Sequence, residues 1–313
     1  EQRRGDARHR RGSTPPRGSG DRFGARPETP GAAACREHMA LELTPLAPMF
    51  GVVIGGIDLR ERQPELTVST LRQLLREHRL LLFRQGADRL VSGERHVEIS
   101  QWFGPLESTF HRHPRSPHVD VFRVSNDPEE GCTQVGRSGW HIDGSFQERP
   151  FKVQLMHFPS VIEGGDTLFA PLTEVIEALP SDTRAEWESL TFVARDGVAH
   201  PLIYPHPETG ARVLCFHCGE PFVHTFAVGF EPASGRARSV QGGAATRETL
   251  REISQRLVSH AYRMEWAVGD FAIVDNLALA HYAVPGTQRA RGEAGLRLLH
   301  RTTVAGDSSP AWE

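Results

Sequence analysis

Residues 139–150 read GWHIDGSFQERP, and they place two side chains that can bind metals, His141 and Asp143, one residue apart. On a β-strand, residues i and i+2 point to the same face. The imidazole and the carboxylate can therefore converge on one point, where they hold a metal ion, exchange a proton or simply pack. The H-x-D pair alone is a weak signal, because the chain has 16 histidines and a lone strand histidine is more often packed or exposed than a ligand.

A second histidine is available at the other end of the chain. His281 follows an apolar segment within AIVDNLALAHYAVPG, residues 272–286. Together with His141 and Asp143 it makes a set of two histidines and one carboxylate. Such a set on one face of an octahedral metal leaves three positions open, which suits Fe(II) in oxygenases. Two open positions can chelate a 2-oxo acid, and the third can take O2.

Short apolar segments separated by turn residues predict a mainly β chain with a few helices packed outside, as in a β-sandwich or barrel. Predicted strands include 80–83, 151–158, 165–170 and 296–306. Residues 262–274 alternate like a β-hairpin around a Gly269–Asp270 turn. Helices are predicted at 67–80, 92–104, 173–190 and 246–261. These elements favour one domain over residues 39–313.

The first 38 residues differ from the rest. They are rich in Arg, Gly and Pro and contain hardly any large apolar side chain. Such a segment cannot bury enough surface to offset the entropy of ordering. We expect 1–38 to be a disordered extension, and the functional protein to begin near Met39.

Composition excludes several classes of function. The net charge is −3, which gives no electrostatic reason to expect a nucleic-acid partner. No apolar run approaches the roughly 20 residues that span a bilayer, so we expect a soluble, cytoplasmic protein with no membrane partner. The four cysteines include the pair Cys215 and Cys218 in CFHC. Two thiols do not complete a zinc site, and we interpret them as buried strand residues.

Three further segments have a recognisable order and spacing relative to GWHIDGSF at 139–146. They are EGGDTLFA at 163–170, VDNLALAHYA at 274–283 and RLLHRTTVAGD at 297–307. Together the four resemble the taurine dioxygenase-like family of Fe(II)- and 2-oxoglutarate-dependent oxygenases, from about Leu41 to Asp307. The resemblance implies a double-stranded β-helix, or jelly roll, with Fe(II) at one open end and with 2-oxoglutarate and O2 as co-substrates.

The resemblance also implies roles for individual residues. His141, Asp143 and His281 are expected to ligate iron. Arg297 is expected to bind the distal carboxylate of 2-oxoglutarate through its guanidinium fork, a geometry suited to carboxylates. Thr167 is expected to donate its hydroxyl to the same carboxylate.

Substrate recognition is expected nearby. Arg301 lies four residues after Arg297, so on a strand both point to the same face, and it is a candidate to hold an anionic substrate. Trp140 and Phe146 are candidates to line the pocket.

The expected reaction is hydroxylation of a small, anionic organic molecule with release of succinate and CO2, and it can lead to C–S or C–O cleavage. Two alternatives stay open from the sequence: a zinc-type hydrolase on the same triad, and a non-catalytic jelly-roll binding protein. A homo-oligomer is also compatible with the sequence.

Overall fold

A computed structural model describes residues 41–107, 112–219 and 221–312. The segment 1–38, which we expect to be a disordered extension, lies outside the described residues, and that expectation stays a prediction. The described chain from residue 41 onward belongs to one compact unit. None of its helices is both long enough and apolar enough to cross a bilayer.

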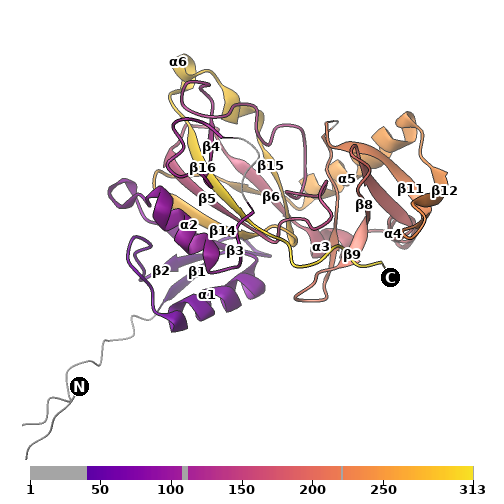
Figure 1. Cartoon of the computed structure of the whole chain (residues 1–313), viewed down its shortest axis with the longest axis horizontal. Coiled ribbons are helices and arrows are strands. Elements are labelled where there is room, and N and C mark those ends of the chain that lie inside the picture. The colour runs from indigo at the N-terminus through magenta and orange to yellow at the C-terminus, as the bar shows by residue number, and fades with distance from the viewer. Residues whose placement is uncertain (1–40, 108–111, 220, 313) are drawn as a thin grey trace, which may run out of the picture. The chain divides into compact units, whose positions relative to one another are not determined.

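A seven-stranded sheet forms the frame of the molecule (Figure 1). Its strand order is β1-β2-β3-β14-β5-β16-β4. The bounds are β1 Glu42–Pro45, β2 Val52–Gly55, β3 Leu80–Arg84, β4 Phe122–Ser125, β5 Val153–Ser160, β14 Asp270–Asp275 and β16 Leu298–Val304. All neighbouring pairs are antiparallel except β2 with β3. The central strands are predicted as continuous apolar runs because both of their faces are covered.

A three-stranded sheet completes the jelly roll. It contains β6 Thr167–Pro171 between β13 Tyr262–Met264 and β15 Leu279–Ala283. The core shared by the two sheets includes Phe158, Phe169 and Trp266, and the rings of Phe158 and Trp266 stack at 4.0 Å. The predicted jelly-roll class is confirmed.

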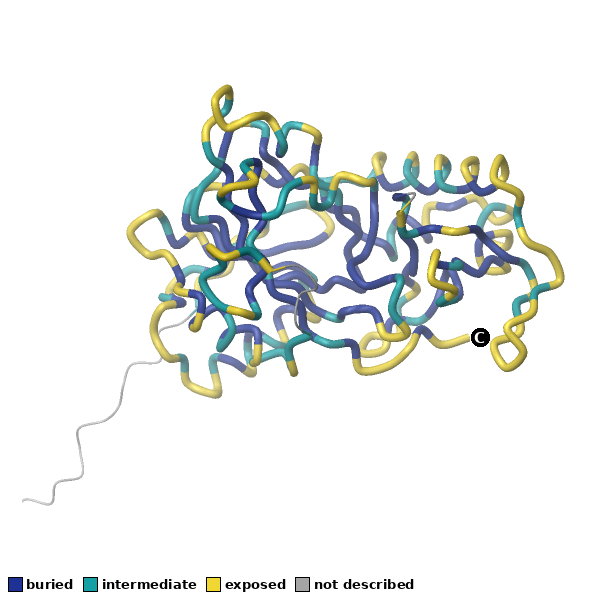
Figure 2. The backbone as a smooth tube through the Cα atoms, turned by 45° about the horizontal axis from the view of Figure 1, so that its top comes forward, coloured by how far each residue is buried: buried dark blue, intermediate teal, exposed yellow. Residues whose placement is uncertain are grey.

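Helices cover the opposite face of the large sheet. They are α1 Glu65–His78 and α2 Gly93–Gln101, with η1 Ala87–Arg89 between them. Strand β5 shows the alternation that separates two cores: Met156 and Phe158 face the jelly-roll interior, whereas Val153 and Leu155 face the layer under the helices. Figure 2 shows the central strands in dark blue, with exposed residues mostly on loops and outer helix faces.

The middle of the chain forms a second layer beside the jelly roll. A four-stranded sheet has the order β12-β11-β7-β8, and its core is continuous with the chain around Trp140 and Ile142. The strands of this sheet are β7 Leu190–Ala194, β8 Ala199–Pro201, β11 Val223–Glu231 and β12 Arg236–Val240. Two further strands, β9 Ile203–Pro205 and β10 Arg212–Leu214, pair with each other. The helices of this part of the chain are α3 Leu172–Glu177, α4 Ser181–Glu188 and α5 Gly243–Ser259. The remaining short helices are η2 Pro285–Gln288 and α6 Arg291–Ala294.

The predicted hairpin at 262–274 is wrong in its pairing. Strand β13 pairs with β6, whereas β14 lies between β3 and β5 in the other sheet. The turn at Gly269 is real, but it connects two different sheets. Alternation of apolar residues identifies a strand, because it reports which face is buried. It does not identify the strands that pair with its edges.

The layer under α2 contains three buried histidines, His96, His157 and His300. Rings of successive histidines lie 6.3 and 6.0 Å apart. Burial lowers the pKa of His157 to about 4 and of His300 to about 3, and it also lowers that of His96. All three are therefore neutral in the folded protein at neutral pH.

Acidification should destabilise the fold through these groups. An unfolded chain binds protons on histidine below about pH 6.5, whereas the folded state resists protonation until the lower folded pKa. Stability should fall as pH drops from about 6.5 toward 4, by about 1.4 kcal/mol per pH unit for each histidine. Urea unfolding at pH 7 and pH 5 measures this slope. The slope should become shallower in His157→Phe, and it should not change in the exposed-histidine control His224→Gln; an unchanged slope in His157→Phe would contradict the assignment.

Candidate metal centre and active-site cavity

The two candidate histidine ligands are brought together by backbone pairing. His141 N–H donates to the His281 carbonyl at 3.2 Å, and His281 N–H donates to the His141 carbonyl at 3.0 Å. Residues that exchange both bonds in this way are directly opposite, and their side chains lie on the same face. The two imidazole centroids are consequently 4.3 Å apart. A chain separation of 140 residues therefore becomes a cross-strand contact.

Asp143 reaches the same point without a strand. The expectation that the H-x-D pair lies on a regular strand is wrong, because His141 forms only isolated bridges and Asp143 lies in a turn. The turn backbone is held instead by the side chain of Asn276, which accepts from Asp143 N–H at 2.8 Å and donates to the Asp143 carbonyl at 2.9 Å.

The three ligand-type side chains fit one metal ion. One donor atom from each of His141, Asp143 and His281 lies within 4.8 Å of the others. The carboxylate oxygens are 3.8 Å from His141 Nε2 and 3.7 Å from His281 Nε2. Two atoms bound about 2.1 Å from a common ion are at most about 4.2 Å apart, so either histidine can share an ion with Asp143.

Protonation states also suit a metal. His141 Nδ1 lies 2.7 Å from the Gly139 carbonyl, so Nδ1 carries the proton and Nε2 is free to bind. Burial lowers the pKa of His281 to about 3 and also lowers that of His141. Burial alone would raise the pKa of Asp143, but Arg301 and the neighbouring imidazoles outweigh it and lower the pKa to about 2. The set is two neutral imidazoles and one carboxylate, as Fe(II) requires.

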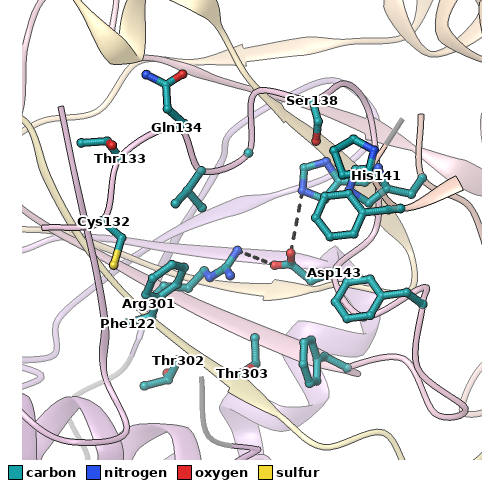
Figure 3. A pocket seen from close by; sticks show the side chains of 18 of the residues that line it. Phe122, Cys132, Thr133, Gln134, Ser138, His141, Asp143, Arg301, Thr302 and Thr303 are labelled. Carbon is teal, nitrogen blue, oxygen red and sulfur yellow. Dashed lines mark hydrogen bonds and ion pairs between the residues drawn. The ribbon is translucent and has the colours of Figure 1, made fainter. Parts of the chain in front are cut away.

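A cavity of about 420 Å³ opens onto His141 and Asp143. Arg301 enters it from β16 and donates from Nη1 to Asp143 Oδ2 at 2.8 Å, while its guanidinium lies 5.2 Å from the Phe122 ring centroid. Figure 3 shows Arg301 and His141 both directed at the Asp143 carboxylate. The other aromatic lining residues are Phe146, Phe151 and Phe222. The cavity is thus mainly apolar, with a cation beside the metal site.

His217 is a cavity residue that sequence reasoning missed. Its segment, 215–218, is interpreted above only as a pair of thiols. His217 forms a bridge with His141, and the two rings stack at 4.7 Å. Its Nδ1 accepts from Gly219 N–H at 2.8 Å, so Nε2 carries the proton. Burial lowers its pKa to about 2. A neutral Nε2–H donor therefore belongs to the cavity wall.

The rings near His217 form a continuous column. Phe222 stacks on His217 at 4.2 Å, and Phe146 stacks on Phe222 at 5.3 Å. Phe146 thus lies at the cavity wall as expected. Trp140 is instead buried in the core, 3% exposed and packed near Tyr282, and it does not line this cavity. The one-residue step from His141 turns its side chain to the opposite face.

The two residues expected to bind a 2-oxo acid lie outside this cavity lining. Arg297 is 3% exposed; its Nε donates to the Gly165 carbonyl at 3.2 Å, and its guanidinium lies 5.5 Å from the Phe158 ring centroid. Burial lowers its pKa to about 10, so it is still a cation at neutral pH. Arg297 forms no direct ion pair among the described residues, although the nearby Asp166 carboxylate, which pairs with Arg263, acts to raise its pKa. A buried cation without a direct ion pair fits an anionic ligand.

Thr167 lies at the start of β6, two residues after Gly165, whose carbonyl accepts from Arg297. Its hydroxyl oxygen accepts from Trp266 Nε1 at 3.0 Å, which leaves the hydroxyl proton free to donate. Gln154 contributes a third polar group: its amide nitrogen lies 3.3 Å from His281 Nδ1, and its Oε1 has no partner among the described residues. The interior beside His281 is therefore polar although it is fully buried.

The jelly roll and its set of two histidines and one carboxylate define a class, the mononuclear non-haem metal oxygenases. Family comparison is more specific. Residues 42–303 match the family model described as taurine catabolism dioxygenase TauD, TfdA family, and the chain belongs to this family. It is accordingly an Fe(II)- and 2-oxoglutarate-dependent dioxygenase. The resemblance inferred from the sequence is confirmed, and the hydrolase and the binding-protein alternatives are not supported.

Individual relatives cover nearly the same span. The chain is 26% identical to the α-ketoglutarate-dependent 2,4-dichlorophenoxyacetate dioxygenase of Cupriavidus pinatubonensis, over 86% of this chain and 99% of that enzyme. It is 27% identical to the α-ketoglutarate-dependent sulfate ester dioxygenase of Pseudomonas putida, over 88% and 93%. A solved taurine dioxygenase from Burkholderia xenovorans superposes with a TM-score of 0.66 at 26% identity, covering 85% of this chain and 91% of that one.

Asp143→Ala should abolish metal binding. In the wild type, Mn(II) should raise the melting temperature, because the ion binds the folded state only; the variant should show no such rise. Asp270→Ala is a matched control, since Asp270 is a buried acid that pairs with Arg84 away from the cavity. The control should have a lower melting temperature and keep the Mn(II) response. A full Mn(II) response in Asp143→Ala would contradict the proposed ligand set.

Proposed function

We propose that this enzyme oxidises a small organic anion at the cavity beside His141 and Asp143, with His281 as the third iron ligand. When bound, Fe(II) and 2-oxoglutarate supply O2-dependent hydroxylation with release of succinate and CO2. The observation that carries the proposal is the position of Arg301, a cation at the cavity wall within 2.8 Å of the Asp143 carboxylate. A substrate held there has its anionic group next to the iron.

Arg301 can bind an anion without releasing Asp143. A guanidinium has five N–H donors, and the contact with Asp143 uses Nη1. The remaining donors can meet a carboxylate, sulfate or sulfonate in the bidentate mode that arginine favours. We infer that His217 Nε2–H donates a second hydrogen bond to the substrate anion. Because this imidazole is neutral, it adds no positive charge beside the metal.

The apolar cavity wall favours a particular kind of substrate body, the part of the molecule that bears the anionic group. Phe122, Phe146, Phe151 and Phe222 surround the cavity, and aromatic side chains favour flat or apolar groups. The relatives named above act on a phenoxyacetate and a sulfate ester. We infer that the substrate combines an anionic head with an apolar body. If hydroxylation occurs at the carbon that bears an ether, sulfate or sulfonate group, the C–O or C–S bond then breaks.

We assign the distal carboxylate of 2-oxoglutarate to Arg297 and Thr167. The buried cation, which forms no direct ion pair among the described residues, and the free hydroxyl proton support this assignment. Their separation from the cavity lining is consistent with co-substrate and substrate entering different sides of the metal. The cytoplasmic location and the homo-oligomer stay predictions.

A substrate panel tests the function. Purified protein with Fe(II), ascorbate, O2 and 2-oxoglutarate should release succinate only with an accepted substrate, across aryloxy acids, alkyl and aryl sulfates, sulfonates and acylated amino acids. Neutral isosteres of an accepted substrate should release far less succinate. Equal turnover of anion and neutral isostere would contradict the role of Arg301.

Arg301→Ala should raise the substrate KM by roughly tenfold or more, the equivalent of one lost hydrogen bond to a charged group, and should raise the KM for 2-oxoglutarate much less. Arg123→Ala is the control, because Arg123 is a partly buried arginine on the adjacent strand that pairs with Glu130 outside the cavity. The opposite ranking of the two KM values in Arg301→Ala would remove the argument for an anionic substrate.

Arg297→Leu should weaken 2-oxoglutarate binding by roughly 100-fold, since a bidentate charged contact is lost, while Mn(II) binding changes little. Calorimetric titration of 2-oxoglutarate into Mn(II)-loaded protein measures the first quantity, and titration of Mn(II) measures the second. Equal loss of both would mean that Arg297 is structural.

A further inference from the structure

Two buried asparagines occupy equivalent positions relative to the two parts of the active site. Asn276 is fully buried and Asn126 is 8% exposed. Each follows the last residue of a strand, β14 and β4 respectively. Each makes three hydrogen bonds to backbone atoms of a segment that is distant in sequence. In both cases the contacted segment includes a residue assigned to the site.

Asn276 replaces a missing strand partner for Asp143. Its Oδ1 accepts from Asp143 N–H at 2.8 Å, and its Nδ2 donates to the carbonyls of Asp143 at 2.9 Å and Phe151 at 2.6 Å. Asn276 N–H also donates to the Lys152 carbonyl at 3.0 Å. The amide therefore makes the two hydrogen bonds to the Asp143 backbone that a neighbouring strand would otherwise make. It also connects the turn at Asp143 to the segment just before β5.

Asn126 makes the same arrangement for Arg297. Its Oδ1 accepts from Arg297 N–H at 2.8 Å, and its Nδ2 donates to the carbonyls of Arg289 at 2.8 Å and Gly295 at 2.9 Å. Arg297 directly precedes β16, whose first residue pairs with Ser125 on β4. The Asn126 side chain thus extends the β4–β16 ladder by one residue and closes the loop that contains η2 and α6.

We propose that Asn276 and Asn126 are separate positioning residues, Asn276 for the metal through Asp143 and Asn126 for the 2-oxo acid through Arg297. Neither amide has a spare donor for a ligand, because both N–H groups of each are bonded to backbone carbonyls. Each asparagine instead fixes the position of a ligand-binding residue. The inference rests on the proposed function, since it assigns Arg297 to 2-oxoglutarate.

The two side chains serve as controls for each other. Both substitutions to Ala remove three buried hydrogen bonds, and each leaves unpaired backbone groups, so both variants should be destabilised to a similar degree. Their effects on ligands should differ. Asn276→Ala should weaken Mn(II) binding roughly 10–100-fold, the range for outer groups that orient metal ligands. Asn126→Ala should leave Mn(II) affinity within a few-fold of wild type.

For 2-oxoglutarate binding, the two variants should rank in the opposite order. Titration of 2-oxoglutarate into protein saturated with Mn(II) should show roughly tenfold weaker binding for Asn126→Ala and nearly normal binding for Asn276→Ala. In turnover assays, added Fe(II) should restore Asn276→Ala, and added 2-oxoglutarate should restore Asn126→Ala. If either alanine variant fails to fold, Asn276→Ser and Asn126→Ser, which keep a smaller polar group on the side chain, are measured with the same expectations.

The outcomes separate this inference from the proposed function. Equal loss of both ligands in both variants, or no loss in either, overturns the positioning roles and leaves the function intact. Wild-type protein that binds Mn(II) but does not bind 2-oxoglutarate overturns the assignment of Arg297, and with it the role of Asn126. The crossed pattern of losses supports the inference, since general destabilisation would weaken both ligands together.

Discussion

The active site depends on one backbone arrangement: residues 140–142 run between β15 on one side and residues 216–218 on the other. On the first side His141 and His281 exchange both of their hydrogen bonds. On the second side Ile142 N–H donates to the Phe216 carbonyl at 3.4 Å, and Cys218 N–H donates to the Trp140 carbonyl at 2.8 Å. The three imidazoles of His141, His217 and His281 are brought together by these bonds. The relative positions of these imidazoles are therefore set by backbone hydrogen bonds.

The charges near the site suit the two ligands proposed for it. Asp143 and Arg301 form an ion pair, so a divalent ion held there would add the net positive charge that an oxo acid can meet. Arg297 is a buried cation that forms no direct ion pair among the described residues, although Asp166 lies near enough to oppose the lowering of its pKa by burial. Burying a charge without a direct partner is costly, which supports the proposal that a ligand supplies the opposite charge.

Local patterns in the sequence predicted a large part of this molecule. The H-x-D pair and the distant His281 predicted a metal site, because few residue types bind metals, and the family resemblance added Arg297 and Arg301; the structure brings His141, Asp143 and His281 together. Helix α2 was also predicted, with Ser92 accepting from Arg95 N–H at its start. The sequence did not predict the pairing of β13, the cavity position of His217 or the backbone hydrogen bonds of Asn126 and Asn276. Each depends on contacts between segments far apart in the chain, and an asparagine that binds backbone has no distinctive sequence pattern.

The ring column has a consequence for altering what the enzyme accepts. Phe146, Phe222, His217 and His141 stack in succession from the cavity wall to the proposed metal site. A bulkier substrate that displaces Phe146 would shift the two rings between it and His141, so widening the cavity at this wall would disturb a proposed metal ligand. The lining at Cys132, Thr133 and Gln134 is not part of this ring column, although the Cys132 backbone pairs with Arg123 and Ser125. Enlargement at Thr133 or Gln134 therefore leaves the column untouched.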